Sequence, residues 1–229
     1  KSGQNWIRNI DFSLAQIVNR CLVDDSGEEA ATTLCNNLAN SLIDYDIFTP
    51  DFNETLEALA QSKPRIFLDC FLGDTQPDNA LIPRLFSQNL DITPNPISKI
   101  ENDMIIEWCD EEPRKRYLVV ASSITPFERA GEQKLHWTDL ALQLIDNAPD
   151  PIQVLERLRS AFRPMSWSGS RAEIMQNRLS LISSLKEHEN STVSEWAETA
   201  EIDFENEIES EHKNEKEWDR QRNAKIGFE

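Results

Sequence analysis

A degenerate helical repeat constrains the fold of this chain more than any other feature of its sequence. Each copy consists of an apolar helix, a short elbow that is acidic or carries proline, and a second apolar helix. The copies lie at residues 105–121, 141–158 and 181–197. Their anchor residues Cys109, Ile145 and Leu185 are 36 and 40 residues apart. Because a period of about 40 residues built from helix pairs is typical of stacked helical repeats, the sequence predicts an all-α fold, an irregular α-solenoid of antiparallel helix pairs.

Composition supports a helical class and limits the partners. The 6 glycines are too few for the turns of an all-β domain, and 39% hydrophobic content is enough for a buried core. The formal net charge is -18, and residues 187–229 hold half of it, with 14 acidic and 5 basic side chains. Such a surface repels a nucleic-acid backbone or an anionic membrane. We therefore expect neither as a partner.

The cysteines and the ends of the chain indicate the compartment. The four cysteines are separated by 14, 35 and 39 residues, without a C-x-x-C motif or a close Cys/His cluster: Cys21, Cys35, Cys70 and Cys109. This spacing predicts no metal site and no cofactor, and it favours a reducing, cytoplasmic location. No apolar run approaches the ~20 residues needed to span a bilayer. The first residue is Lys1 rather than Met, which favours a piece of a longer polypeptide.

Apolar spacing predicts the individual helices. A stripe over residues 12–23 indicates a helix with Asp11 as its N-cap, and Ser26 is the expected N-cap of a helix over 28–43. We expect these two helices to form an antiparallel hairpin. Further helical stripes lie at residues 50–60 and 64–72.

The rest of the chain divides at prolines and charged stretches. Residues 77–96 are proline-rich and contain one short predicted helix at 80–88. Residues 126–137 are predicted to be a loop, and the repeat register favours helix over strand at 117–122. The apolar stripe of a long, charged C-terminal helix ends near Ile208. The predicted segments are N-terminal helical pairs (1–76), a proline-rich connector (77–100), repeat pairs (101–210) and a charged tail (211–229).

The sequence offers no catalytic constellation. Ser170 could be read as a nucleophile, but it lacks the flanking glycines of a nucleophile elbow, and Glu173 three residues later favours a helix N-cap. The three histidines are scattered over different segments. Carboxylates are plentiful, so a metal-dependent enzyme with a carboxylate site in residues 44–112 stays open as an alternative.

Aromatic and basic side chains indicate where a partner could bind. Trp167 lies in a polar loop, where it either fills a gap between repeats or anchors a partner. Basic residues concentrate at 114–116 and at Arg157, Arg159 and Arg163, and they could face an acidic partner or the acidic tail of the chain itself. The candidate partner-binding residues are Trp137, Arg157, Arg163 and Trp167.

Residues 167–197 resemble a HEAT-type repeat, whose elbow commonly carries Asn or Asp before a Val. Asn190 and Val193 fit this pattern, while Ser194 stands where such repeats usually have Arg. The charged ending resembles the C-terminal helical-repeat regions of large bacterial proteins, some of which act in phage defence. The resemblance implies a HEAT- or armadillo-like solenoid in a cytosolic bacterial protein, and with it a role as the sensor part of a phage-defence system.

We therefore expect a non-catalytic scaffold or recognition region that binds a protein partner or another domain of its own polypeptide. The alternatives are the carboxylate enzyme and an oligomerisation module, in which the long final helix pairs between two copies of the chain. A stacked helical array presents a long surface with little reorganisation, which suits recognition.

Overall fold

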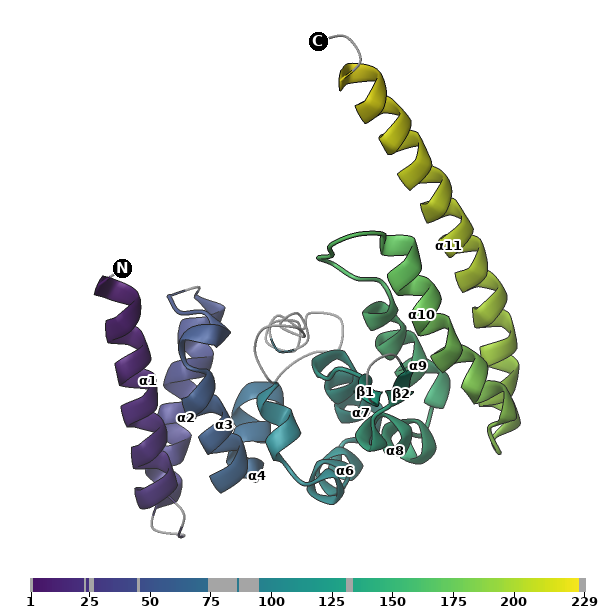
Figure 1. Cartoon of the computed structure of the whole chain (residues 1–229). Helices are drawn as coiled ribbons and strands as arrows, with labels where there is room; N and C mark the ends of the chain where they lie inside the picture. The colour runs from purple at the N-terminus through teal and green to yellow at the C-terminus, as the bar shows by residue number, and fades with distance from the viewer. Residues whose placement is uncertain are drawn as a thin grey trace. The chain divides into compact units, whose positions relative to one another are not determined.

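The part of the chain that the structure describes is mostly helical, with a two-stranded antiparallel hairpin (Figure 1). The computed structural model describes residues 2–22, 24, 27–44, 46–73, 86, 95–130 and 134–226. The predicted all-α class is confirmed, and so is the helix at 117–122. The short helix predicted at 80–88 and the Ser26 cap lie outside the described residues, apart from Phe86.

The elements follow the chain in this order: α1 (Ser2–Cys21), α2 (Glu28–Ile43), α3 (Asn53–Ser62), α4 (Pro64–Leu68), α6 (Asn102–Glu111), α7 (Pro113–Ser123), β1 (Phe127–Ala130), β2 (Lys134–Trp137), α8 (Asp139–Asn147), α9 (Pro151–Arg159), α10 (Arg171–Ser184) and α11 (Ser191–Ile226). A π-helical turn, Asp69–Gly73, follows α4 directly, and we call it the π turn. Among the described residues, none of the helices combines the length and the apolar character that a membrane crossing requires.

The chain forms two compact units, which are described separately. Unit 1 comprises residues 1–126 and 138–158, and unit 2 comprises residues 127–137 and 159–229. The hairpin therefore belongs with the C-terminal helices, although α8 follows it in the chain. These units divide the chain differently from the segments proposed from the sequence.

Proline marks the elbows of unit 1. Pro64, Pro113 and Pro151 each stand at the start of the second helix of a pair. Proline is suited to the first helical position because its fixed φ is helical and its missing N–H has no intrahelical acceptor there. The residue before each proline is also steered away from helical geometry, so one residue type both ends the first helix and starts the second.

Successive pairs in unit 1 stack on one another: α1 packs against α3, and α2 packs against α4 and the π turn. The sequence predicts that α1 and α2 pack against each other as a hairpin. This prediction is wrong, because each of the two helices packs mainly against a later helix or turn. Helix α6 in turn packs against α4 and α8. The rings of Phe67, Phe71 and Phe86 form a buried cluster with centroids 4.6 to 5.9 Å apart. This stacking of helix pairs is compatible with a helical solenoid.

Asp11 is not the N-cap predicted from the sequence, because α1 begins at Ser2 and Asp11 lies within it. Its buried carboxylate instead caps α3, whose own N-cap residue, Phe52, has no side-chain acceptor. Asp11 accepts hydrogen bonds from the amides of Glu54 at 3.0 Å and Thr55 at 2.8 Å. The Thr55 hydroxyl donates to the same carboxylate at 2.7 Å. The cap thus joins two stacked helices.

In unit 2, the predicted loop at residues 126–137 is wrong. Residues 126–137 were expected as a loop, but β1 and β2 pair here with Phe127 opposite Trp137. Both side chains are buried, and their rings lie 5.8 and 5.6 Å from the ring of Phe162. The Trp137 indole donates to the carbonyl of Leu181 at 2.9 Å. Strands of four residues carry too short an alternation to be recognised in the sequence.

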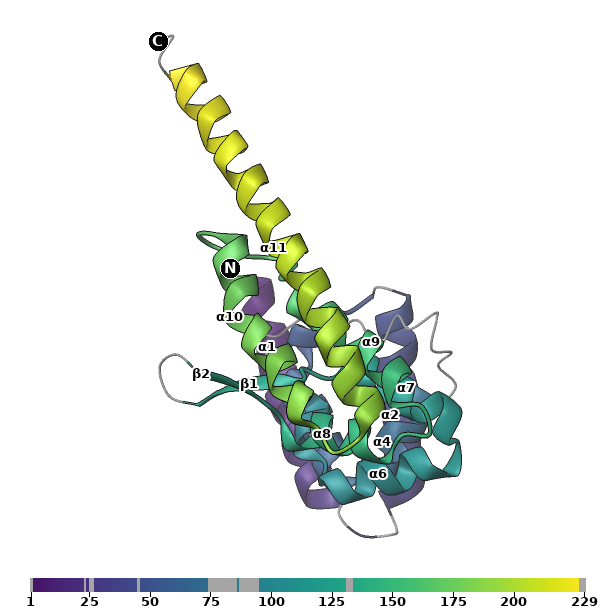
Figure 2. The ribbon, with the colours of Figure 1, turned by 90° about the vertical axis from the view of Figure 1, so that its right-hand side faces the viewer.

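Helices α10 and α11 form the body of unit 2. The Ser170 hydroxyl accepts a hydrogen bond from the amide of Glu173 at 3.1 Å, which confirms the predicted N-cap of α10. The long C-terminal helix is also confirmed, since α11 has 36 residues. Its buried stripe packs on α10 and consists of Val193, Ala197, Ala200, Phe204 and Ile208. Figures 1 and 2 both show α11 continuing past the N-terminal end of α10.

Candidate functional site

The loop between the Ser160–Phe162 turn and α10 is held to α11 at both ends. At its start, the Arg163 guanidinium donates from Nε and Nη2 to the Glu207 carboxylate at 2.7 and 2.6 Å. At its end, the Ser170 hydroxyl donates to Glu215 at 2.8 Å, and Arg171 donates to Glu211 at 3.0 Å. We call residues 164–169 the clamped loop. Glu207, Glu211 and Glu215 recur every four residues, so they face the same side of α11.

Glu215 also serves as a remote cap for α10. Its carboxylate accepts hydrogen bonds from the backbone amides of Arg171 at 2.6 Å and Ala172 at 3.2 Å, two of the donors that a helix N-terminus leaves unsatisfied. A negative charge is stabilised at this end of a helix. Two side chains, Ser170 from the loop and Glu215 from α11, therefore share the capping of α10.

Charge pairing keeps the clamping carboxylates ionised. The Arg163 guanidinium holds the pKa of Glu207 below its ordinary value, with a further contribution from Arg159. Burial raises the pKa of Glu215, but the Ser170 hydroxyl and the two amides more than offset it, so the pKa is lowered. Both carboxylates are therefore charged near neutral pH. Of the basic residues singled out in the sequence, Arg159 and Arg163 thus pair with Glu207 of the acidic helix α11.

The clamped loop exposes two large apolar side chains. Met165 is 82% exposed and Trp167 is 49% exposed. The Arg171 guanidinium lies over the Trp167 ring, 5.0 Å from its centroid, which fixes one face of the indole. Gly169 has φ +83°, a conformation that other residues adopt at a cost, and it lets the chain turn into α10. The loop ends are thus anchored while its apolar side chains face solvent.

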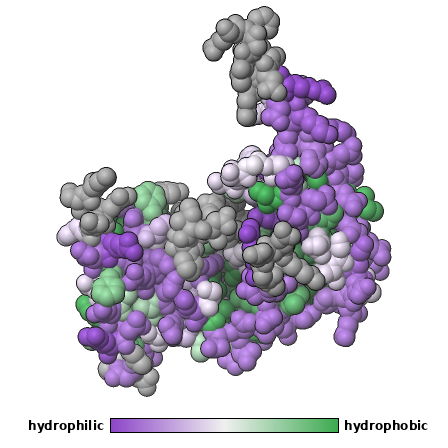
Figure 3. All heavy atoms as spheres, in the orientation of Figure 1, coloured by the Kyte–Doolittle hydropathy of each residue, from purple (hydrophilic) through white to green (hydrophobic). Residues whose placement is uncertain are grey.

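Trp218 adds a third exposed side chain to the same end of unit 2. It is 72% exposed and lies three residues after Glu215. That spacing places it on the same side of α11, about 4.5 Å further along the helix axis than Glu215. We call Met165, Trp167 and Trp218 the apolar surface of unit 2. The surface of α11 is otherwise mostly hydrophilic in the view of Figure 3.

The structure separates the four residues predicted to bind a partner. Trp137 is buried in the core of unit 2, where its indole contacts are intramolecular. Arg157 is half-buried on α9, in unit 1. Arg163 and Trp167 are brought together, one as an anchor of the clamped loop and the other as a side chain that the loop exposes. The sequence analysis assigned no role to Trp218. A tryptophan within an otherwise charged stretch is unusual, and this signal could have marked Trp218 as a candidate binding residue.

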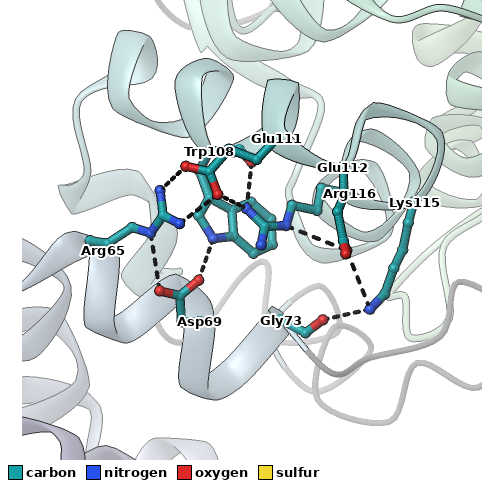
Figure 4. A network of polar contacts seen from close by, with 8 residues as sticks. All are labelled: Arg65, Asp69, Gly73, Trp108, Glu111, Glu112, Lys115 and Arg116. Atoms are coloured by element: carbon teal, nitrogen blue, oxygen red, sulfur yellow. Dashed lines mark hydrogen bonds and ion pairs between the residues drawn. The ribbon is translucent and has the colours of Figure 1, made fainter.

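A polar network in unit 1 joins α4 to α6 and α7 (Figure 4). The Trp108 indole donates to Asp69 at 2.8 Å, and Arg65 donates to Asp69 at 3.0 Å. Arg65 also forms a two-bond pair with Glu111. Arg116 donates to Glu111 at 2.7 Å, and its guanidinium lies 4.2 Å from the centroid of the Trp108 ring.

This network bears on the carboxylate site considered for residues 44–112. The Arg65 guanidinium, with help from Arg116, lowers the pKa of Glu111 to about 2. Glu111 and Asp69 both have arginine partners, an arrangement that fixes the junction between helix pairs. A carboxylate with so low a pKa does not take up a proton near neutral pH, as a general base must. In the part of the chain that the structure describes, His, Cys, Asp and Glu side chains form no group of three or more that could hold a metal ion.

Comparisons with protein-family models, curated proteins and solved structures gave no match to this chain. The function proposed below therefore rests on the chain's own residues.

Proposed function

We propose that this chain is a non-catalytic helical scaffold whose unit 2 binds a protein partner, or another domain of the same polypeptide, through its apolar surface. The observation that carries the proposal is the clamped loop, which is anchored at both ends and yet leaves Met165 82% and Trp167 49% exposed. A HEAT-like repeat and a cytoplasmic location belong to the proposal. A sensor role in a bacterial defence protein is also part of the proposal, and it is supported by the sequence resemblance alone.

The exposed side chains are of the types that dominate binding energies. Tryptophan is enriched among the residues that cost most when truncated at protein interfaces. Methionine is flexible and polarisable, and it is common at adaptable binding surfaces. Because the ion pairs of Arg163 and Arg171 already hold the loop ends, binding would order few additional residues. A smaller entropy loss on binding leaves more of the contact energy as affinity.

The charge around the loop limits the chemistry of the partner. From Ser191 to Glu211, α11 carries eight acidic and no basic side chains. A complementary partner would present an apolar pocket for Trp167 with basic residues at its rim. Opposite charges at a rim mainly accelerate association, so the association rate with such a partner would fall as salt is raised.

The two alternatives have less support. Two of the carboxylates of residues 44–112, Asp69 and Glu111, are engaged by Arg65. An oligomerisation module would bury Trp218 between two copies of α11. Light scattering on the purified chain separates that alternative, since only it predicts a dimer that Trp218→Ala dissociates.

The test compares partner capture by the wild-type chain and by a Met165→Ala/Trp167→Ala variant. The matched control is Ile202→Ala, which removes an apolar side chain that is 60% exposed on α11 but lies outside the apolar surface. Captured proteins are quantified by mass spectrometry and the best candidate is purified. Loss of a tryptophan at the centre of an interface typically costs at least ~2 kcal/mol, so we expect Kd to rise about 30-fold or more.

The same variants separate binding from packing. We expect the double variant and Ile202→Ala to keep the wild-type Tm within about 2 °C, and only the double variant to lose the partner. A fall in Tm of the double variant with unchanged capture would show that the loop is a packing element and would refute the proposal.

A further inference from the structure

A groove lies between the elbows of two successive helix pairs in unit 1, where α7 and α9 begin. Its volume of about 430 Å³ is within the range of ligand-binding pockets. Its floor is formed by buried side chains: Tyr117, Leu118 and Val154. The Tyr117 hydroxyl donates to Asp110 at 2.8 Å, so the polar end of this side chain is already satisfied. The other apolar lining residues lie at or beside the two elbows: Pro113, Ala148 and Pro149. The groove therefore offers a preformed surface to an apolar side chain.

Exposed polar side chains also line this groove: Arg114, Asp150 and Gln153. The Asp150 carboxylate accepts hydrogen bonds from the backbone amide of Gln153 at 3.2 Å and from its side-chain Nε2 at 2.6 Å. Because Asp150 directly precedes α9, these bonds tie the carboxylate to the first turn of that helix. A carboxylate of a ligand is therefore repelled from the Asp150 side of the groove and attracted to Arg114.

Arg114 differs from its two neighbours in the basic stretch at residues 114–116. Lys115 donates to the carbonyl of Gly73 at 2.6 Å, and Arg116 donates to Glu111 at 2.7 Å (Figure 4). Within the part of the chain that the structure describes, the Arg114 side chain has neither an ion pair nor a hydrogen bond. A guanidinium can bind a carboxylate through two parallel hydrogen bonds. Of the three basic residues, Arg114 is therefore the one that has its charge available for a ligand.

A second hollow lies beside the groove and shares Gln153 with it. Its volume is about 310 Å³, and its other lining residues also belong to α9: Ile152, Glu156 and Arg157. Arg157 is one of the residues predicted from the sequence to bind a partner. The stretch from Ile152 to Arg157 is about 7.5 Å long, the length of two to three extended residues. The groove and the hollow together therefore fit a short peptide better than a single small molecule.

We propose that the groove and the hollow bind a short extended segment of a protein, in which a large apolar side chain stands next to an acidic residue. The apolar side chain packs on Tyr117 and Val154, and the acidic residue pairs with Arg114. Glu156 disfavours a second acidic residue at the other end of the segment. The inference is independent of the function proposed above, because it concerns unit 1 and not the apolar surface of unit 2.

The two contacts should contribute to affinity by different amounts. Burial of a side chain of the size of phenylalanine should lower Kd at least ~10-fold. An ion pair with an exposed arginine should lower Kd less, about 5-fold, because solvent and salt screen it. The affinity therefore depends mainly on the apolar side chain, whereas the preference for an acidic neighbour depends on Arg114.

The test titrates the full chain into the peptide acetyl-Ala-Phe-Glu-Ala-Ala-amide, whose phenylalanine carries fluorine, and measures Kd by fluorine NMR. We expect Kd to rise about 5-fold when Gln replaces Glu in the peptide. An unlabelled peptide with Ala in place of Phe should compete at least ~10-fold less well than the unlabelled parent.

Two variants of the chain locate the binding site. Arg114→Gln should weaken binding of the Glu peptide about 5-fold and leave the Gln peptide unchanged. The matched control is Arg129→Gln, which removes an exposed arginine of β1 outside the groove and should change neither Kd. Ala148→Leu adds side-chain atoms within the groove, and it should abolish binding of both peptides in a chain with an unchanged circular dichroism spectrum. The Arg114→Gln result does not depend on whether Ala148→Leu folds.

Each alternative outcome would overturn the proposal. No binding to the wild-type chain, or equal Kd for the Glu and Gln peptides, would show that the groove does not select an acidic residue beside an apolar one. Binding that survives Ala148→Leu but is lost in Met165→Ala/Trp167→Ala would assign the peptide to the apolar surface of unit 2. Equal affinity for phenylpropionate would show that the ligand is a small carboxylate and not a protein segment.

Discussion

Replacing Asp11 by Ala should destabilise unit 1 by a predictable amount, because this carboxylate caps a helix that is distant in sequence. The substitution removes an N-cap, which typically costs ~1 kcal/mol. It also leaves the amide of Thr55, a fully buried residue, without its Asp11 acceptor, whereas the Thr55 hydroxyl keeps the backbone carbonyl of residue 11 as an acceptor at 3.1 Å. Each buried unsatisfied donor costs at least ~1 kcal/mol. We therefore expect a loss of about 2 kcal/mol in the free energy of unfolding of unit 1.

Hydrogen exchange followed by mass spectrometry is the suitable assay, because a chain with two compact units need not unfold in one step. A loss of about 2 kcal/mol corresponds to exchange about 30-fold faster for α3 amides that exchange through unfolding of unit 1. Amides of α10, in unit 2, should exchange at the wild-type rate. Asp11→Asn keeps one acceptor oxygen and should lose about 1 kcal/mol.

Asp103→Ala is the matched control, since Asp103 is an exposed acid in the first turn of α6. It should cost less than about 0.5 kcal/mol. A double-mutant cycle of Asp11→Ala with Thr55→Val should give a coupling free energy of about 1 kcal/mol. A loss below about 1 kcal/mol for Asp11→Ala, or equal acceleration of exchange in α3 and α10, would refute the capping role.

Three further predictions concern the network and unit 2. The pKa of Glu111 is lowered in the folded chain, so its pairing with Arg65 stabilises unit 1 fully above the unfolded pKa of ~4.3, and this stabilisation is lost as pH falls towards 2. Between pH 5 and 2.5, the urea midpoint of the wild type should therefore fall more than that of Glu111→Gln. Glu215→Gln should cost about 1 kcal/mol and accelerate exchange in the first turn of α10, with α3 unaffected. Trp137→Phe removes the indole hydrogen bond to the Leu181 carbonyl, which still accepts from the Ser184 hydroxyl at 2.7 Å. We expect it to lower the stability of unit 2 by about 1 kcal/mol in urea unfolding, whereas equal stability would show that the indole N–H is dispensable.

The sequence alone determined the local features of this protein. The prolines that start α4, α7 and α9 mark the elbows because their effect on φ and on the preceding residue acts within two positions of the chain. The cap at Ser170 and the length of α11 were equally readable, since helix capping and a spacing of three or four residues are properties of one segment.

Tertiary structure alone decided which surfaces meet. Asp11 caps a helix 44 residues away, a pairing that depends on how α1 stacks and not on its neighbours in sequence. The burial of Trp137 followed from the short hairpin, whose four-residue strands carry too little periodicity to be recognised. The ion pair of Glu207 with Arg163 is likewise a contact between distant segments. Composition shows that such charges are present, but only packing of the helices decides their partners, because long-range contacts form where apolar faces are buried together.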